Sequence, residues 1–515
     1  MLKPLPTSTA TFRKIIEGDL LYVDKTEEIY HLAHRTTGAY FLSRPRRFGK
    51  SLFISTLEEL FDGNRELFQG LWIDKSDYEW PVHPVIRLDL SLYPSATPDD
   101  LKENLKLYLE YAAEKYDVTL RSGPYYAQFG DLIRQLSTKT QVVILIDEYD
   151  KPLLDHITDI KTAKQIRDIL KGFYTVIKAM ERHVRLAFIT GVSKFSRVTI
   201  FSELNNLTDL TLRPSFATAL GLTEEEIRHY FSEHIAAFAQ KKEISEEAFL
   251  DEMRQWYNGF CFAAGGENVY NPFSTMQLFD AQHFANYWFE SGTPTFLIKL
   301  IHQQNYEIER FANLYVEELA LSTFDIGRLA IVPLLFQTGY LTIKGYDPQS
   351  RRYRLYYPNH EVENAFLIHL LDAFSNFQQR LSASHLWYLI EALQTHDLDE
   401  FFKQLKVFFA NIDYDLHLRN EKYYQTIFYL IFMLMGLKIQ AETKTNDRHI
   451  DAMIEVADHI YLFEFKLDKD AQQAVDQIAD KEYAEKYRSR GKEITQIGVN
   501  FDSKVGQVSE WQVVA

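Results

Sequence analysis

The stretch FLSRPRRFGKS, residues 41–51, has the residue types of a phosphate-binding loop. In the pattern GxxxxGK[ST], backbone N–H groups at the head of a helix surround the phosphates, the lysine reaches the β and γ oxygens, and the hydroxyl binds magnesium. Gly49, Lys50 and Ser51 stand at the required positions, whereas Arg44 stands where the first glycine belongs. We expect ATP with Mg2+ to bind through the whole loop: Arg44, Pro45, Arg46, Arg47, Phe48, Gly49, Lys50 and Ser51.

An apolar run that ends in acids, VVILIDEYD, supplies the other half of such a site. A phosphate-loop ATPase needs a strand that ends in an acid for the magnesium, often followed by a glutamate that orients the attacking water. Asp147 and Glu148 fit these roles. Taken separately, the two motifs also fit a solvated basic turn and a strand end with scattered acids; together they favour a nucleotide site. A third strand, LAFITGVSK, ends in Thr190, Ser193 and Lys194, and a polar residue at this strand end is expected to sense the γ-phosphate.

A second set of chemical groups lies in RHIDAMIEVADHIYLFEFKL, near the C-terminus. Residues two apart in a strand face the same side, so Glu464 and Lys466 project together while Phe465 packs into the core. Asp451 comes close to this pair if its strand and the next form a hairpin. Two carboxylates then offer Mg2+ an oxygen-rich site, and the lysine can polarise or deprotonate a water, which suits metal-assisted cleavage of a phosphodiester. The alternative is an ordinary ion pair on a solvent-facing strand.

The elements that must position these groups can be read from hydrophobic periodicity. Residues 1–222 alternate amphipathic helical stretches with four strand candidates: AYFLS, PVIRLDLS, QVVILIDEYD and VRLAFITGV. Uninterrupted apolar runs such as residues 142–146 are typical of a parallel strand covered on both faces. We therefore expect a doubly wound α/β domain, with a strand before the phosphate loop and a helix after it.

The rest of the chain predicts a helical region, a winged-helix-like region and a second α/β domain. The helical region is interrupted by the turn-rich YNGFCFAAGGENVYNPFS, and the winged-helix-like region has an apolar helix followed by two alternating strands joined at YDPQS. The last part reads as a core helix, three strands in a meander, a crossover helix and further strands. The expected domains are residues 1–222, 223–300, 301–380 and 381–515.

The composition is that of an ordinary folded protein, with 515 residues, 46% hydrophobic and 25% charged. The single cysteine, Cys261, excludes an intramolecular disulfide and fits a reducing compartment, so we expect the cytoplasm. The formal charge of −16 argues against a protein that coats nucleic acid, although it leaves room for a local cationic groove. No membrane association is expected, because the most apolar run, residues 426–439, is shorter than the roughly 20 residues of a spanning helix.

Several segments of the N-terminal half together resemble the AAA-ATPase-like proteins common in bacteria: YVDKTEEIYHL, FLSRPRRFGKSLF, LIDEYDKPL, ITGVSKFSRVTIFSELNNLTDLT and WYNGFCF followed by VYNPFS. The resemblance spans residues 5–290 and implies a parallel-sheet ATPase domain of the AAA/STAND-like kind, in which the arginine-rich loop is the usual form. It implies that Asp24 and Lys25 lie near the nucleotide edge, with Arg197 or Arg213 as a finger acting on a neighbouring subunit. Because ATPases of this class often act as oligomers, we expect a homo-oligomer by analogy.

The C-terminal part resembles the PD-(D/E)XK nuclease superfamily, in particular the nuclease-like domain commonly fused to the family just named. The resemblance spans residues 385–515 and rests on the order of a helix, an acid, an E-x-K strand and a glutamine. It implies a restriction-endonuclease-like fold with two metal ligands, a water-activating lysine, an auxiliary acid and a helper near the phosphate, which are respectively Asp451 and Glu464, Lys466, Glu421, and Gln477. There is one departure, because members often read G-R-x-D where this chain reads RHID at residues 448–451. The catalytic aspartate survives the change, but the glycine that would let a substrate approach the backbone is missing.

These features predict an ATP-regulated, Mg2+-dependent nuclease acting on nucleic acid, with DNA favoured over RNA, and such a fusion would suit defence or mobile-element biology. Tyrosines between arginines in RRYRLYY would add stacking on single-stranded bases, unless the strand is simply half-buried. The competing interpretation is a nucleotide-switched binding or signalling protein whose nuclease-like domain holds nucleic acid without cutting it. An intact acid pair with its lysine favours the enzyme.

Overall fold

The structure is a computed structural model, and two compact units divide the chain between them. It describes residues 2–34, 38–194, 204, 206–290, 297–298, 300–301, 308, 311, 314–322, 330–375, 379–410, 412, 421–435, 438–440, 451–456, 458–480 and 485–514. The first unit comprises Met1–Phe296 and Asn313–Glu363, and the second comprises Leu297–Ala312 and Asn364–Ala515. The prediction of four domains stays a prediction.

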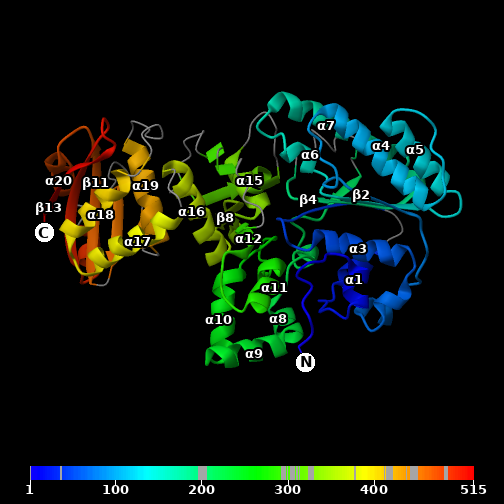
Figure 1. Ribbon diagram of the computed structural model, residues 1–515, viewed down its shortest axis with the longest axis horizontal. Helices are drawn as coiled ribbons and strands as arrows, with labels where there is room; N and C mark the ends of the chain where they lie inside the picture. The colour runs from blue at the N-terminus through cyan, green and yellow to red at the C-terminus, as the bar shows by residue number, and fades with distance from the viewer. Residues whose placement is uncertain are drawn as a thin grey trace. The chain divides into compact units, whose positions relative to one another are not determined.

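The first unit is built on a five-stranded parallel sheet with the order β2-β3-β4-β1-β5 (Figure 1). Every residue of β3 is buried, as its unbroken apolar sequence predicts for a strand covered on both faces. The four predicted strands are confirmed, and the short β5 was not predicted because three residues carry too little pattern. The strands are β1 Gly38–Ser43, β2 Val85–Asp89, β3 Val142–Asp147, β4 Val184–Gly191 and β5 Leu207–Asp209.

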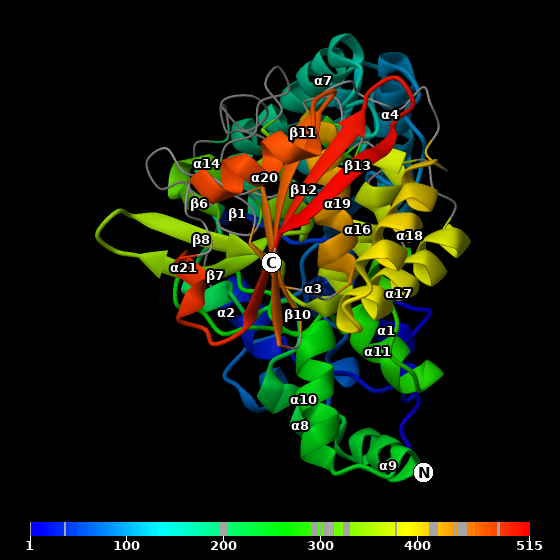
Figure 2. The ribbon, with the colours of Figure 1, turned by 90° about the vertical axis from the view of Figure 1, so that its left-hand side faces the viewer.

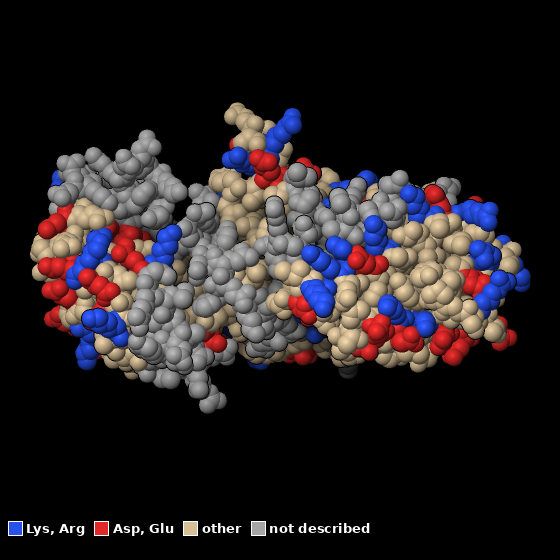
Figure 3. Space-filling view, turned by 90° about the horizontal axis from the view of Figure 1, so that it is seen from above, with Lys and Arg blue, Asp and Glu red and all other residues tan. Residues whose placement is uncertain are grey.

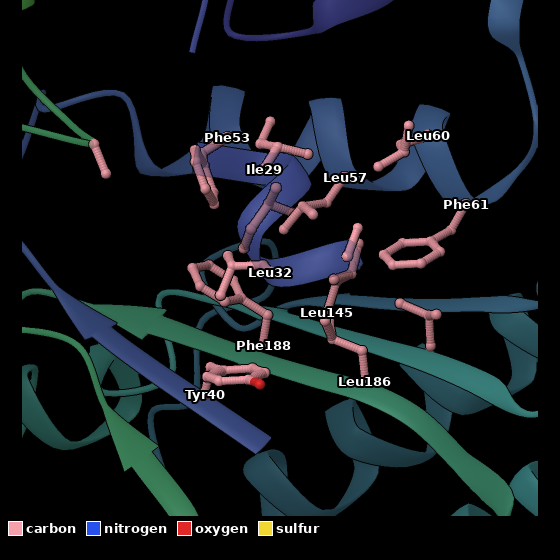
Figure 4. Packing of buried hydrophobic residues seen from close by; sticks show 14 of the residues in the cluster. Ile29, Leu32, Tyr40, Phe53, Leu57, Leu60, Phe61, Leu145, Leu186 and Phe188 are labelled. Atoms are coloured by element: carbon pink, nitrogen blue, oxygen red, sulfur yellow. The ribbon is translucent and has the colours of Figure 1, made fainter. Parts of the chain in front are cut away.

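Helices cover both faces of this sheet. On one face, α1 Phe12–Glu17, α2 Thr26–Ala33 and α3 Lys50–Phe61 pack through the apolar cluster in Figure 4, where Phe53 and Leu57 meet Phe188 and Leu145. On the other face lie α4 Pro98–Lys115, α5 Tyr125–Leu136 and α7 Ile160–Ala179 (Figure 1). The start of α4 is fixed by a capping box, in which the side chains of Thr97 and Asp100 each accept a backbone N–H of the other residue. A short α6, Lys151–Leu154, follows β3.

The remainder of the first unit is helical, with a small antiparallel sheet of order β6-β8-β7. The predicted helix and hairpin are found as α15, β7 and β8, and β6 adds a strand that was not predicted. In the hairpin, Tyr353 and Tyr357 are buried, so these two predicted stacking residues do not present free ring faces. The elements are α8 Glu224–Tyr230, α9 Ser232–Lys242, α10 Glu246–Tyr257, α11 Pro272–Ala281, α12 Tyr287–Glu290, β6 Leu314–Glu317, α14 Glu318–Ser322, α15 Ile331–Thr338, β7 Thr342–Asp347 and β8 Arg352–Tyr356.

The second unit contains a mixed five-stranded sheet with the order β13-β12-β11-β10-β9. β11 and β12 are parallel and are connected through α20, whereas the other neighbours are antiparallel. α20 lies on one face of the sheet, drawn in front of β11 and β12 in Figure 2. Phe463 and Phe465 point to the opposite face and contact Phe428 of α19. The predicted meander, crossover helix and core helix are therefore confirmed.

The elements of this part are α16 His360–Ser375, α17 Gln379–Gln394, α18 Leu398–Ala410, α19 Glu421–Leu434, β9 Lys438–Gln440, β10 Ala452–Val456, β11 His459–Leu467, α20 Ala471–Asp480, α21 Glu485–Arg488, β12 Glu493–Asp502 and β13 Gln507–Val514. The first four residues of α16 belong to the first unit and the others to the second. Among the helices of the described residues, none has the length and apolar character needed to cross a membrane.

Two candidate active sites

The phosphate loop joins the end of β1 to the start of α3. Gly49 has φ 89° at the N-cap of α3, a left-handed conformation that glycine adopts without strain. Lys50 starts the helix, and its Nζ lies 3.0 Å from the carbonyl oxygen of Pro45 and 3.7 Å from a carboxylate oxygen of Glu148. The helix N-terminus directs unpaired N–H groups at this position, which is the arrangement that binds phosphate.

Asp147 ends β3 and is fully buried near Ser51 and Glu148. Burial raises the pKa of Asp147 to about 6; a hydrogen bond to Ser51 opposes the rise, and the charge of Glu148 adds to it. Its Oδ1 accepts the N–H of Glu148 at 3.0 Å, and its Oδ2 has no hydrogen-bond partner among the described residues. Such a carboxylate oxygen beside a hydroxyl is the kind of hard donor set that Mg2+ prefers, so these residues fit the ion.

The Arg44 side chain turns away from the phosphate loop and is only 1% exposed. Its guanidinium donates to the carbonyl oxygens of Ser43, Thr211 and Phe216 at 2.9, 2.9 and 2.8 Å. It also lies 4.1 Å from the ring centroid of Phe262, and burial lowers the pKa of Arg44 to about 9. Arg44, at the first-glycine position, therefore attaches the start of the loop to the segment that contains Thr211 and Phe216. Only the backbone of Arg44 is then available to a phosphate.

The other loop side chains divide into two groups. Pro45 and Phe48 are buried, whereas Arg46 and Arg47 are exposed. Arg47 has φ 65° and Glu148 has φ 48°, so both carry a left-handed backbone that is uncommon outside glycine and often found at functional sites. The exposed positive charge of the loop therefore comes from Arg46 and Arg47.

The three candidates for a γ-phosphate sensor all form contacts inside the first unit. Thr190 Oγ1 donates to a carbonyl oxygen of β1 at 2.6 Å, and Ser193 Oγ donates to Asp150 at 2.5 Å. Lys194 forms an ion pair with Asp209. A contact between any of them and the nucleotide stays a prediction.

Asp24 and Lys25 hold α2 in place. Asp24 accepts the backbone N–H and the hydroxyl of Thr26, at 2.9 and 2.7 Å, and Lys25 pairs with Glu226 of α8 at 2.6 Å. Arg213 is exposed, and Arg197 lies outside the described residues. Proximity to the nucleotide and the identity of an arginine finger therefore stay predictions.

Two further acids at the same edge of the sheet were not predicted. Asp89 ends β2 and is the register partner of Asp147, and Asp150 is fully buried where it accepts N–H groups of Val192 and Ser193. The signal for Asp89 was present, because VIRLD ends in an acid as VVILID does. Asp150 gave no signal, since its partners lie far along the chain.

The second candidate site is in the second unit, where β10 and β11 form the predicted antiparallel hairpin. Asp451 directly precedes β10, and its Oδ2 accepts the backbone N–H of Phe465 at 2.7 Å. Phe465 is only 1% exposed and lies between Glu464 and Lys466 in β11, so this hydrogen bond brings Asp451 to the polar pair. The hairpin therefore gathers the three residues as the E-x-K spacing predicts.

Glu464 is the centre of the polar contacts. Lys466 Nζ donates to Glu464 Oε1 at 3.0 Å, and Gln477 Nε2 of α20 donates to the same oxygen. Glu464 and Lys466 are 2% and 8% exposed, so the ion pair is shielded from water and differs from an exposed strand pair. The alternative of a solvent-facing edge is therefore wrong for these residues.

Burial raises the pKa of Asp451 well above its usual range, and the negative charge of Glu464 adds to the rise. Glu421, at the start of α19, contributes in the same direction, which places its charge within electrostatic reach of Asp451. Lys466 opposes the shift. Crowded carboxylates of this kind fit a divalent cation, because Mg2+ is commonly held by one or two carboxylates with water and phosphate completing its shell.

Within the part of the chain that the structure describes, no group of three or more His, Cys, Asp or Glu residues is arranged to hold a metal ion. That Asp451 and Glu464 are metal ligands stays a prediction. Residues 448–450, where the glycine is missing, lie outside the described residues.

The two units thus define a class of protein that combines a phosphate-loop ATPase-like sheet with a nuclease-like mixed sheet. Comparison with protein families agrees, since residues 6–201 match the family described as "Predicted AAA-ATPase" and residues 419–511 match the PD-(D/E)XK nuclease superfamily. The chain is also similar to "Uncharacterized protein in vnfD 5'region" of Azotobacter chroococcum mcd 1, with 38% identity over 532 residues that cover 99% of each chain. The chain belongs to the AAA-ATPase-like family and carries a C-terminal PD-(D/E)XK nuclease superfamily domain.

Proposed function

We propose that this protein binds and hydrolyses ATP and that the nucleotide controls a Mg2+-dependent nuclease which cleaves phosphodiester bonds. The observation that supports this most is the cluster of Asp451, Glu464 and Lys466, in which the Glu464–Lys466 ion pair is buried and the acid pair and the lysine are all present. A domain that had kept its fold only for binding would have no need for this costly arrangement, since an ion pair that is removed from water loses hydration energy.

In the ATP site, Lys50 would bind the β- and γ-phosphate oxygens, and Glu148 would orient the attacking water. Ser51 and Asp147 would hold Mg2+, which neutralises charge on the phosphates when it is bound. Oε1 of Glu148 lies 3.7 Å from Nζ of Lys50, so both groups would be within reach of a phosphate bound between them. Glu148→Gln should therefore abolish ATP hydrolysis while leaving ATP binding intact, and hydrolysis that is unaffected would refute the site.

In the nuclease site, Asp451 and Glu464 would hold Mg2+, which polarises the phosphodiester and acidifies a bound water. Lys466 would orient that water and take part in its deprotonation. Gln477 would keep Glu464 in position, because it donates to the carboxylate oxygen that Lys466 also contacts. Glu421 would tune the charge of the site.

The test is a nuclease assay on DNA and RNA with Mg2+, with and without ATP. Lys466→Ala should reduce cleavage by roughly 10²- to 10⁴-fold, the range of a lost general base. The matched control is Lys469→Ala, because Lys469 follows the same strand and its side chain is exposed. Removal of Mg2+ by a chelator should abolish cleavage by the wild type.

Cleavage that survives Lys466→Ala unchanged would refute the site assignment. Binding of nucleic acid without any cleavage would instead support the competing proposal, a nucleotide-switched binding or signalling protein. Cleavage of equal rate with and without ATP would refute nucleotide control.

DNA is proposed as the substrate before RNA, in a defence or mobile-element role, and the assay with both polymers decides between them. On the face drawn in Figure 3, acidic and basic side chains of the described residues lie interspersed, in keeping with the net charge of −16. Binding would therefore depend on local groups rather than on a general cationic surface. Self-association is proposed by analogy with related ATPases, and sedimentation with and without ATP tests it.

A further inference from the structure

Trp288 of α12 contacts the phosphate loop directly. Its indole Nε1 donates to the carbonyl oxygen of Arg46 at 2.9 Å, and the side chain is 6% exposed. Gly339 lies on the same side of the loop, where an added Cβ would be 2.7 Å from Cγ of Pro45 and 3.3 Å from Cζ2 of Trp288. The loop backbone at residues 45–46 therefore rests against a surface made by Trp288 and Gly339.

The direction of one peptide group follows from this hydrogen bond. In a trans peptide the carbonyl of one residue and the N–H of the next point to opposite sides, and the described chain contains no cis peptide bond. Since the Arg46 carbonyl is held by Trp288, the N–H of Arg47 points away from Trp288. Arg47 has φ 65°, a conformation that needs support from its surroundings.

Trp288 is itself held by a buried carboxylate. Its backbone N–H donates to Oε1 of Glu361 at 2.7 Å, and the Ser274 hydroxyl lies 3.0 and 2.8 Å from the two oxygens of the same carboxylate. Glu361 is fully buried and lies in the first turn of α16. One carboxylate thus joins α11, α12 and α16.

The turn-rich segments that the ATP chemistry does not use hold this junction together. The carbonyl oxygen of Asn258 accepts Nδ2 of Asn359 at 2.8 Å, and Asn359 in turn accepts the N–H of Val362 in α16 at 3.1 Å. Gly259 has φ 96°, and an added Cβ would lie 2.1 Å from the carbonyl oxygen of Pro358. The YNG segment, residues 257–259, and the YNPFS segment, residues 270–274, therefore hold Glu361 in position.

We propose that Trp288 is a positioning residue of the nucleotide site: it fixes the Arg46–Arg47 peptide so that the Arg47 N–H is presented to a phosphate, and Glu361 fixes Trp288. The proposal rests on the function proposed above. Because Glu361 belongs to α16, the loop and the first turn of this helix are coupled. The same helix continues beyond Glu363, where the first unit ends.

The test measures the affinity of the full chain for a fluorescent N-methylanthraniloyl ATP with Mg2+, together with KM and kcat for ATP. Trp288→Phe keeps a buried ring and removes the N–H donor. We expect Kd and KM to rise about five-fold, the weight of one neutral hydrogen bond, and kcat to stay within about two-fold, because the bond acts in binding and not in the chemical step.

The matched control is Trp80→Phe, since Trp80 is a half-buried tryptophan of the same unit that packs on Phe68 and Tyr78. It should leave Kd unchanged. An equal Kd for the two variants would overturn the proposal, as would a fall in kcat without a rise in KM.

Glu361→Gln tests whether Glu361 fixes Trp288, and it leaves the indole ring unchanged. It can replace Trp288→Phe as the test if that variant does not fold. It should also raise Kd. In the double variant, the fold increase in Kd should be smaller than the product of the two single increases, because both changes act on one contact. Independent effects would overturn the role of Glu361. A wild type that does not bind the nucleotide would refute the proposed function itself, whereas wild-type binding with unchanged variants refutes only this inference.

Discussion

Arg44 shows how a single residue can serve the fold from inside a ligand-binding loop. Burying a guanidinium is costly unless its donors are satisfied. Here the two terminal nitrogens donate to three backbone carbonyls and the group lies over an aromatic ring, while Nε has no hydrogen-bond partner among the described residues. The hinge that a glycine would provide is thereby replaced by a fixed attachment. The loop gains a defined starting point, and the neighbouring exposed arginines keep their charge available.

Restoring the missing glycine should therefore harm the protein. We expect Arg44→Gly to lower the free energy of unfolding by about 2 to 4 kcal/mol, the range for breaking a buried hydrogen-bond network, and to weaken ATP binding. Arg46→Gly is the control in the same loop, because Arg46 is exposed, and it should change stability far less. Chemical denaturation followed by tryptophan fluorescence measures the free energy of unfolding of both variants. A more stable Arg44→Gly would contradict the anchoring role.

Asp150 gives the stability a pH dependence. Burial raises the pKa of Asp150 to about 6 from 3.8, against hydrogen bonds from Ser193 and Val192. Since the folded protein binds this proton more tightly than the unfolded chain, the contribution favours folding at pH below about 4 and is lost as pH rises to about 6. Asp150→Asn cannot titrate, so the advantage of the wild type over this variant should shrink across that window, by up to roughly 3 kcal/mol.

The measurement is denaturation of wild type and Asp150→Asn at several pH values between about 4 and 7. A difference between them that stays constant, or that grows with pH, would show that burial does not dominate this carboxyl.

At the scale of elements, the position of α20 determines the geometry of the candidate nuclease site. It packs on β12 at Gly498, where an added Cβ would lie 2.4 Å from the carbonyl oxygen of Ala471 and 2.9 Å from a methyl group of Val475. Glycine is needed here because the backbone of the helix approaches the strand closely. This contact fixes the position of Gln477 relative to Glu464.

Gly498→Ala should push α20 away from the sheet and separate Gln477 from Glu464. We expect nuclease activity to fall at least ten-fold, as for a misplaced supporting residue, while ATP hydrolysis is unchanged. Gly123→Ala is the control, because its added Cβ meets only Ala127 Cβ at 3.7 Å. Parallel nuclease and ATPase assays decide, and full nuclease activity in Gly498→Ala would contradict the role of this packing.

For the whole molecule, the sequence predicts what is encoded locally. The apolar run of β3 with its terminal acid, and the E-x-K spacing in β11, pointed to the two candidate sites because each strand carries its own sequence pattern. Long-range partners had no such signal. Arg44 reaches Phe216 across 172 residues, and Trp288 reaches Arg46 across 242. Their roles depend on tertiary packing, which no local pattern contains.

The order of strands has a consequence for synthesis on the ribosome. β1, which leads into the phosphate loop, pairs with β4 and β5 and not with β3, which carries Asp147. While Val184–Gly191 is still inside the ribosome, no strand of the nascent chain connects β1, which leads into the loop, to β3, which carries Asp147. Because distant strand pairing is slow, the two halves of the proposed nucleotide site stay unconnected until this late strand has inserted between them.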